Sequence, residues 1–287
     1  VVAVGGDRDV LRAFHQLGVK SVPVLGVSES DGGGFLTEVD VSGFRGALSR
    51  LARSDYHLEE ALRLRVDVDD LSVPPALNEV AVFPIRSATL MEYMLEVDGE
   101  TIWRDCADGV MVATPTGATA YAMSAGGPMV HSKAEVFVIV PVNSIDVTRR
   151  PLIASSHSSI TLAELNSRCD IEAIIDGTFR VKAKQRIQVS GTTQPAKLVR
   201  LPEVSPTLDK VARKVRLAEE MLKMPPSAKL ILKTLEYEGP MSQRELIRRT
   251  MLPERTTRLA LSLLIKRGLV KRRPLLRDAR QKLYQVV

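Results

Sequence analysis

The sequence is poor in cysteine and has no long apolar run. Its two cysteines, Cys106 and Cys169, lie far apart and have no second Cys or His at ligand spacing. Neither a disulfide framework nor a zinc site is therefore indicated, and a reducing cytoplasm fits best. The longest apolar runs, such as VFVIVPV at 136–142, are too short to span a bilayer, and the N-terminus has no basic segment followed by an apolar one. We expect a soluble, cytoplasmic protein.

Internal repeats and low-complexity segments are also lacking. The 287 residues, of which 45% are hydrophobic and 26% charged, can bury a large core and are enough for two or three domains. The net charge of +6 is unevenly distributed. Residues 225–287 contain 15 Lys and Arg against 5 Asp and Glu, whereas the residues before them contain 25 against 29. We expect these two parts to meet different partners.

The pattern of apolar residues divides the chain into regions. Residues 1–64 alternate short apolar runs with helical stretches, which is typical of an α/β domain with a parallel sheet. Residues 65–202 contain many short β-rich segments, which predicts an all-β, sandwich-like antiparallel domain with one helical interruption at 119–127. A charged connector helix is predicted within residues 203–224, and residues 225–287 predict a small α+β domain.

The stretch ADGVMVATPTGATAYAMSAGGPMV at 107–130 is the most informative segment. The hydroxyls of Thr114, Thr116 and Thr119 alternate with small residues just before a helical pattern. Backbone N–H groups and hydroxyls can converge there on an anion, because no bulky side chain is in the way. The alternative is a tight strand-to-helix turn with a Ser or Thr cap.

Over residues 1 to about 200 the sequence resembles NAD kinases. Their strongest signature is DG, four residues, TPTGSTAY, a short polar step and GGP, which here reads DGVMVATPTGATAYAMSAGGP with Ala118 where Ser is usual. Other landmarks follow in the family's order: GGDRD at 5–9, GGFLTEVD at 33–40, LNEVAV at 77–82, VNSIDVTRRPLI at 142–153 and IIDGT at 174–178.

The resemblance implies a two-domain enzyme that holds NAD between its domains and phosphorylates the adenosine ribose 2′-hydroxyl. Asp7 would orient or deprotonate that hydroxyl, Asn78 and Glu79 would hold the ribose and phosphates, and Asp108 would approach the nicotinamide end. Other residues would line the dinucleotide pocket or the phosphate-cradling loop: Gly5, Gly6, Arg8, Thr116, Thr119, Ala120, Tyr121 and Ser124. The implied ligands are NAD or NADP, ATP or polyphosphate as donor, and Mg²⁺. Phosphoryl transfer needs positioning, charge neutralisation and a proton acceptor more than covalent help.

These residues also have simpler interpretations. Asp7 could cap the helix that follows it, Asn78-Glu79 could be a turn that enters a strand, and Tyr121 could be half-buried core. The four histidines, His15, His57, His131 and His157, lie near no other ligand type at a useful spacing. We interpret them as surface or hydrogen-bonded residues.

The chain departs from the family's pattern at its start. Arg8 stands at the second motif glycine and Asp9 at the following threonine, in the loop that would cradle the donor's phosphates. Arg8 either fills that space or supplies a guanidinium that clamps the polyphosphate, unless Asp7 and Asp9 tie it up in a local ion pair. The family also has a β-α-β portion before this strand. An incomplete sequence, an alternative start and a reduced α/β domain all stay open as explanations.

The last region resembles a winged helix-turn-helix domain. Three helical patterns occupy about 226–239, 242–250 and 253–268, followed by two strands around a basic tip. At the start of the third helix, Arg255, Thr256, Thr257 and Arg258 would make major-groove contacts with duplex DNA. At the wing, Lys271, Arg272, Arg273, Arg277 and Arg280 would contact phosphates. The alternative is a domain used for dimerisation or protein contact, and a homodimer or higher homo-oligomer is expected.

Two functions remain open. The first is an NAD kinase that carries a DNA-binding module. The second is a transcriptional regulator in which a catalytically impaired kinase-like domain senses NAD or NADP. Asp7, Asn78, Glu79 and the threonine-rich motif favour the kinase, whereas Arg8 and the absent front portion favour the sensor.

Overall fold

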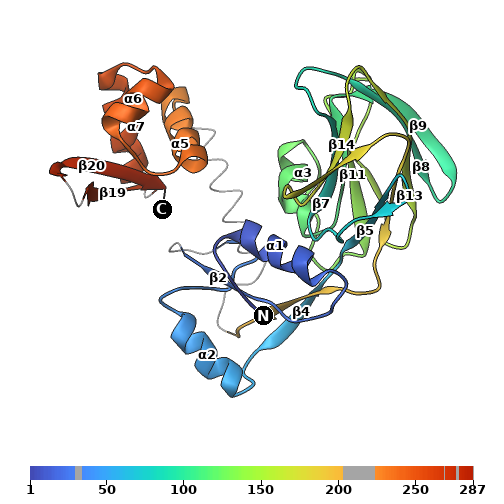
Figure 1. Cartoon of the computed structure of the whole chain (residues 1–287), viewed down its shortest axis with the longest axis horizontal. Helices are drawn as coiled ribbons and strands as arrows, with labels where there is room; N and C mark the ends of the chain where they lie inside the picture. Colours follow the sequence, from blue (N-terminus) through green and yellow to red (C-terminus); the bar gives the residue numbers. More distant parts are fainter. Residues whose placement is uncertain (30–33, 203–223, 268, 276–277, 287) are drawn as a thin grey trace. The chain divides into compact units, whose positions relative to one another are not determined.

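The computed structural model describes residues 1–29, 34–202, 224–267, 269–275 and 278–286. The chain divides into two compact units, residues 1–208 and 209–287 (Figure 1). The expected connector helix lies outside the described residues except for Met224.

The first unit begins with a three-stranded parallel sheet, in the order β1 (Val2–Val4), β2 (Leu25–Ser28), β3 (Val39–Asp40). Helix α1 (Asp7–Leu17) connects β1 to β2, and α2 (Phe44–Ala52) follows β3. The predicted β-α alternation is therefore present. In α1, Val10, Leu11 and Phe14 are buried, because their spacing puts them on one face of the helix.

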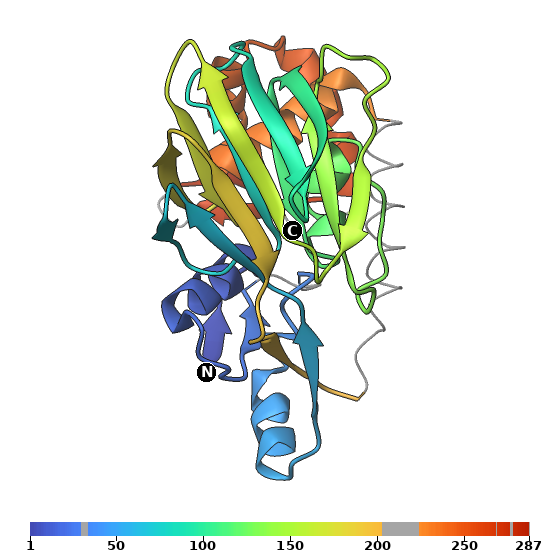
Figure 2. The same cartoon turned by 90° about the vertical axis from the view of Figure 1, so that its right-hand side faces the viewer.

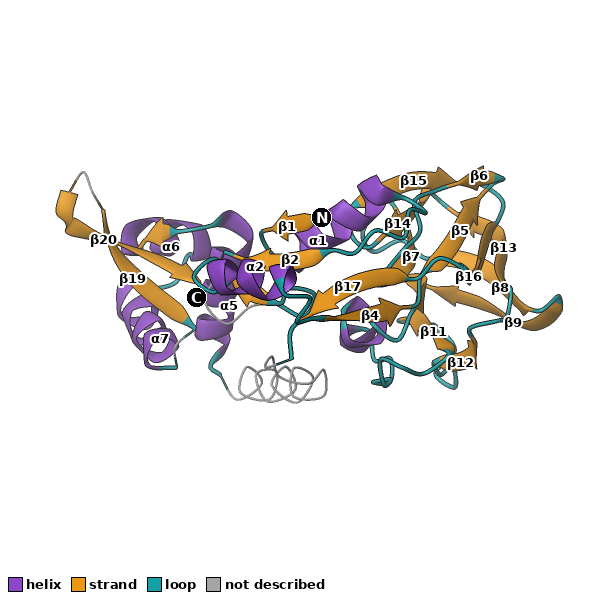
Figure 3. Ribbon diagram, turned by 90° about the horizontal axis from the view of Figure 1, so that it is seen from below, coloured by secondary structure: helices purple, strands orange, loops and turns teal. Residues whose placement is uncertain are grey.

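A segment from late in the chain returns to this first part. Strand β17 (Ala196–Arg200) pairs antiparallel with β4 (His57–Ala61), and an isolated bridge joins Leu198 to Val24 just before β2 (Figure 3). The sequence pattern predicts a single β-rich region over residues 65–202. The structure instead puts β17 next to strands from the first 64 residues.

Two six-stranded antiparallel sheets form most of the first unit (Figure 2). The first, in spatial order, is β12 (Leu152–Ser155), β11 (Val136–Val142), β10 (Gly109–Ala113), β7 (Glu79–Pro84), β14 (Ile171–Ile175), β15 (Phe179–Ala183). The second is β6 (Leu71–Ser72), β5 (Leu64–Val68), β16 (Ile187–Gly191), β13 (Ile160–Ser167), β8 (Met91–Val97), β9 (Glu100–Ala107). The prediction of an antiparallel β-rich region is confirmed.

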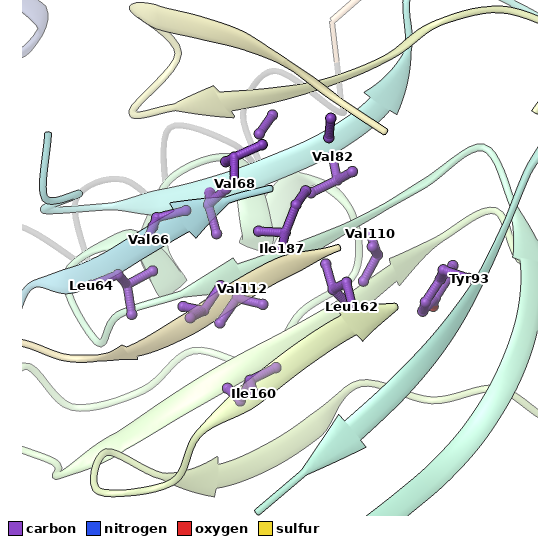
Figure 4. Close-up of a cluster of buried hydrophobic side chains, with 14 of the residues drawn as sticks. Leu64, Val66, Val68, Val82, Tyr93, Val110, Val112, Ile160, Leu162 and Ile187 are labelled. Carbon is purple, nitrogen blue, oxygen red and sulfur yellow. The ribbon is translucent and has the colours of Figure 1, made fainter. Parts of the chain in front are cut away.

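The main hydrophobic core lies between these sheets. Alternate residues of β5, Leu64, Val66 and Val68, are buried, as the two-residue period of a strand requires. Figure 4 shows them in one cluster with Val112 and Ile160, which come from different sheets. The interdigitated side chains join the sheets into a sandwich.

The outer face of the first sheet is covered by a short helical segment. It consists of the 3-10 turn η1 (Gly117–Thr119) and helix α3 (Tyr121–Ser124). Ala118 and Ala122 pack in a small cluster against Ala81 and Met111 of the sheet. The small residues of the threonine-rich motif therefore let its backbone lie close to the strands.

The second unit has the order α5 (Pro226–Glu238), β18 (Met241–Ser242), α6 (Gln243–Thr250), α7 (Glu254–Lys266), β19 (Val270–Leu275), β20 (Asp278–Val286). The three predicted helices are present. Ser242 begins α6 by accepting a hydrogen bond from the Glu245 N–H, and the Glu245 carboxylate accepts one from the Ser242 N–H. The strands form an antiparallel sheet in the order β18-β20-β19. No helix in the described parts of the chain is long and apolar enough to cross a membrane.

Arg63 joins α1 to the sandwich from a buried position. Its guanidinium donates to the carbonyl oxygens of Gly18 at 2.6 Å, Pro75 at 2.9 Å and Phe14 at 3.3 Å. Only 1% of the residue is exposed. Burial lowers the pKa of Arg63, and the Asp176 carboxylate opposes this shift. Arg63 stays charged at neutral pH, because a guanidinium is not deprotonated in proteins.

We expect Arg63→Leu to lower the free energy of unfolding by roughly 2–4 kcal/mol, because buried carbonyls lose their donor. The matched control is Arg65→Leu, two residues further along in β5. The Arg65 side chain is 63% exposed and pairs with Asp67. Its replacement should therefore lower the free energy of unfolding by no more than about 0.5–1 kcal/mol. Urea unfolding of both variants measures the difference. Equal effects would show that the buried bonds of Arg63 contribute nothing.

Candidate functional site

The threonine-rich turn is bonded to the segment that precedes β7. The Thr114 hydroxyl donates to the Leu77 carbonyl at 2.6 Å and accepts from the Gly117 N–H at 3.1 Å. The Thr114 N–H donates to the Asn78 carbonyl at 2.8 Å. The motif after β10 and the Asn78-Glu79 pair are therefore held together as one rigid piece.

Two hydroxyls of the threonine-rich turn are bonded within the protein. Thr114 is fully buried, and the Thr119 hydroxyl, also buried, donates to the Thr116 carbonyl at 3.1 Å. Both hydroxyls donate to backbone carbonyls, as in a tight strand-to-helix turn. That this motif meets an anion stays a prediction.

Gly117 is required by the close approach of two backbones. A Cβ at this position would lie 2.0 Å from the Asn78 carbonyl oxygen and 2.4 Å from its carbon. Neither atom belongs to a flexible side chain, so any larger residue must displace the backbone. The glycine of the TPTG sequence thus allows the turn to pack directly against Asn78.

From another direction, the 77–79 segment is held by Asp176, which begins the turn between β14 and β15. Its carboxylate accepts from the backbone N–H groups of Leu77 at 2.8 Å, Asn78 at 2.7 Å and Glu79 at 3.1 Å. His15 of α1 lies against the same carboxylate, with Nε2 2.9 Å from Oδ2. Asp176 has a left-handed backbone with φ +48°, a conformation that Asp tolerates.

A cavity of about 500 Å³ opens beside this segment. Three predicted site residues, Glu79, Asp108 and Tyr121, line it together. The Tyr121 ring stacks on Phe83, with centroids 6.1 Å apart. Asp108 accepts a hydrogen bond from the Asn143 amide at 2.8 Å. Aromatic walls with a few placed polar groups are typical of a small-molecule site.

Basic side chains complete this cavity. Arg86 and Arg180 are among its lining residues, and Arg180 also forms an ion pair with Glu172. A second cavity of about 640 Å³ shares Arg86 and is lined by both Cys106 and Cys169. The fold thus puts two cysteines that lie far apart in the sequence beside the same cavity.

Asp7 is the first residue of α1, and it holds a neighbouring loop. Its carboxylate accepts from the N–H groups of Phe35 and Leu36, each at 2.8 Å. Gly34 lies so close that a Cβ there would meet Asp7 Oδ1 at 2.0 Å. Asp7 is therefore bonded to the GFLTEVD landmark and is not the cap of its own helix.

The two residues that depart from the family's pattern, Arg8 and Asp9, differ in their contacts. The Asp9 carboxylate accepts from the Gly6 N–H at 2.9 Å and pairs with Arg12 at 3.3 Å. Arg8 is exposed on the first turn of α1 and has no ion pair within the described part of the chain. Asp9 thus pairs with Arg12, and the alternative of a local ion pair with Arg8 is not found among the described residues. Gly5 has φ +136°, which only glycine adopts readily.

The remaining predicted pocket residues lie around the same turn. Asn78, Thr116 and Ala120 are half-buried, and Ser124 is exposed. Sequence reasoning missed Asp176, His15 and Arg63. The IIDGT landmark contains Asp176 and was the available signal for it. Nothing in the sequence marks Arg63, because its partners are backbone carbonyls.

In the second unit, the residues predicted to contact DNA differ in how exposed they are to solvent. Arg255, Arg258 and Arg272 are exposed, whereas Thr256 and Lys271 are half-buried. Thr257 is fully buried, so the prediction that it contacts DNA is wrong: at this point α7 turns that face toward the core of the unit. Arg277 lies outside the described residues, as do the side chains of Arg273 and Arg280.

Known proteins resemble the first unit along its length. Residues 1–56 match the ATP-NAD kinase N-terminal domain, and residues 77–201 match the ATP-NAD kinase C-terminal domain. An NAD kinase of Methanopyrus kandleri is 38% identical over 203 residues, which cover 70% of this chain and 72% of that protein. An NAD kinase of Thermococcus sibiricus is 36% identical over 205 residues, covering 71% and 73% of the two chains.

Two solved structures share the fold. A yeast NADH kinase complexed with NADH has a TM-score of 0.66 at 25% identity, covering 75% of this chain and 65% of the yeast chain. An NAD kinase from Archaeoglobus fulgidus in complex with ATP has a TM-score of 0.63 at 28% identity, covering 74% and 82%.

We expect Gly117→Ala to destabilise the first unit by roughly 1–3 kcal/mol, because the added Cβ overpacks the contact with Asn78. Gly46→Ala is the matched control. Gly46 lies in α2 with no atom within 4 Å of an added Cβ, so alanine should stabilise by about 0.5–1 kcal/mol through helix propensity. Urea unfolding gives both values, and a neutral Gly117→Ala would contradict the close approach.

Proposed function

Because this chain belongs to the NAD kinase family, we propose that it transfers a phosphoryl group to the adenosine ribose 2′-hydroxyl of NAD. The observation that carries the proposal is the cavity lined by Glu79, Asp108 and Tyr121. Asn78 and Glu79, immobilised at its edge by Asp176 and Thr114, are suited to hold the ribose and phosphates. A site fixed before the ligand arrives loses little freedom on binding.

Asp7 is the proposed acceptor of the hydroxyl proton. An ionised carboxylate has about four lone-pair sites, and the bonds from Phe35 and Leu36 use two of them. The other two remain for the 2′-hydroxyl. The same two bonds fix the direction in which the carboxylate points, which is the positioning that phosphoryl transfer requires.

The phosphoryl donor, ATP or polyphosphate, is proposed to meet Arg8 on the first turn of α1. Arg8 is exposed and carries a guanidinium that can bond phosphate oxygens in pairs. It would act as a charge clamp in place of the bare glycine backbone. Asp9 already accepts the Gly6 N–H, so the backbone N–H groups of this turn offer less to an anion.

Mg²⁺ is proposed to arrive with the donor. In the described parts of the chain, no group of three His, Cys, Asp or Glu is placed to hold a metal ion. Mg²⁺ typically keeps several waters and binds substrate phosphates together with one or two carboxylates. Asp7 and Asp9 in this loop could supply such carboxylates. When bound, the ion would neutralise phosphate charge.

The second unit is proposed to be a winged helix-turn-helix domain that binds duplex DNA. Its order of helices and strands supports this, and so do the exposed Arg255 and Arg258 on α7. A helix of this kind presents its N-terminal residues to base edges, and the wing contacts the backbone. Such domains usually read two half-sites, so a homodimer is part of the proposal.

The departures at Arg8 and Asp9 also support a second candidate, a regulator that senses NAD or NADP without turnover. Both candidates need the dinucleotide cavity, and they differ in whether phosphate is transferred. A sensor requires reciprocal coupling: bound DNA must change the dinucleotide affinity by the same factor by which the dinucleotide changes DNA affinity.

We expect Asp7→Asn to lower kcat by about 10²- to 10⁴-fold, because it removes a positioned proton acceptor. The dissociation constant for NAD should stay nearly unchanged. The control is Asp55→Asn, an exposed carboxylate 3.9 Å from Arg50, which should behave as wild type. NADP formation and calorimetry with NAD give the two quantities. An unchanged rate would mean that Asp7 only holds the 34–36 loop.

We expect alanine at Arg272 and Arg273 together to weaken binding to all DNA sequences and to flatten its salt dependence, because phosphate contacts release counterions. Alanine at Arg255 or Arg258 should mainly reduce discrimination between DNA sequences. Each lost base contact should lower the free-energy difference between the correct and a wrong base by about 1–3 kcal/mol. Arg45→Ala, an exposed arginine of α2, is the control. Filter binding at several salt concentrations distinguishes these results, and no DNA binding at all would refute the proposal for this unit.

A further inference from the structure

A polar contact joins helix α1 to the turn between β14 and β15. His15 Nε2 lies 2.9 Å from Asp176 Oδ2, and His15 Nδ1 lies 3.1 Å from the Thr178 hydroxyl. The His15 side chain is 10% exposed and that of Asp176 is fully buried. Because an ionised carboxylate only accepts, Nε2 carries a proton toward it. Both ring nitrogens are therefore engaged, and the orientation of the imidazole is fixed.

The Asp176 carboxylate passes this constraint on to the dinucleotide-binding segment. Oδ2 accepts from His15 and from the Leu77 N–H, and Oδ1 accepts from the N–H groups of Asn78 and Glu79. These bonds use all of the lone-pair sites that a carboxylate offers. Loss of the His15 donor would leave a lone pair of this buried carboxylate without its partner, and the same carboxylate holds the N–H groups of Asn78 and Glu79.

We propose that His15 is a positioning residue: through Asp176 it fixes the Asn78-Glu79 pair relative to α1, whose first residue is Asp7. The inference rests on the proposed function, because it assigns the proton acceptor to α1 and the dinucleotide to the 77–79 segment. These groups come from different elements. A displacement of about 1 Å between an acceptor and its hydroxyl can cost on the order of 10²-fold in rate.

Arg63 provides a second attachment of the same helix. It bonds the carbonyls of Phe14 and Gly18 at the end of α1 and the carbonyl of Pro75 just before the 77–79 segment. The apolar face of α1 already packs in the core, and the polar contacts at His15 and Arg63 further restrict its direction. Arg63 thus holds the helix in place, and His15 adds the bond that reaches the Asp176 carboxylate.

The test compares His15→Phe, which keeps a ring but neither hydrogen bond, with His15→Gln, whose amide can still donate to Asp176. His157→Phe is the matched control, since the His157 side chain is 84% exposed. For each variant, kcat, the dissociation constant for NAD and the hydrogen exchange of the Leu77, Asn78 and Glu79 amides are measured. Should His15→Phe fail to fold, His15→Gln carries the comparison with wild type.

We expect His15→Phe to lower kcat at least about tenfold, to change the NAD dissociation constant less than about threefold, and to speed exchange of the three amides. His15→Gln should recover most of the rate. Faster exchange with unchanged kcat would overturn the proposal, because His15 would then be purely structural, and so would a His15→Gln variant as slow as His15→Phe. If wild type makes no NADP, the proposed function fails on that result alone, and the exchange rates still test the bond to Asp176.

Discussion

The geometry of the site depends on one buried carboxylate, that of Asp176. A charge removed from water is costly unless donors replace the lost hydration, and here three backbone N–H groups and His15 do so. The buried Arg63 guanidinium adds a favourable charge nearby. Because these donors come from α1 and the 77–79 segment, satisfying one charge forces the helix, the segment and the β14–β15 turn into a single arrangement.

Much of this arrangement can be predicted from the sequence, because it rests on local patterns. The β-α alternation at the start, the alternating strands of the sandwich and the three helices of the second unit follow from apolar periodicity and caps. The site could be predicted as a set of motifs. Glu79, Asp108 and Tyr121, for example, lie in one cavity although they come from different landmarks.

The rest could not be predicted, because the partners involved leave no mark on the sequence. Arg63 and Asp176 bond to backbone groups, which every residue carries. The inward direction of the Thr114 hydroxyl depends on a carbonyl 37 positions away. The pairing of β17 with β4 depends on where a chain segment returns after the whole sandwich. Thr257 looked like part of a basic helix face, but the rotation of α7 against its neighbours buries it.

In the proposed reaction, Asp7 and the Asn78-Glu79 pair act on one ribose, and α1 and Asp176 hold them in position. A crystal structure of this chain with bound NAD tests it most directly. We expect the adenosine ribose to lie against Asn78 and Glu79, with its 2′-hydroxyl within about 2.6–3.2 Å of an Asp7 carboxylate oxygen. A dinucleotide bound elsewhere, or a 2′-hydroxyl turned away from Asp7 while both loop bonds persist, would contradict it.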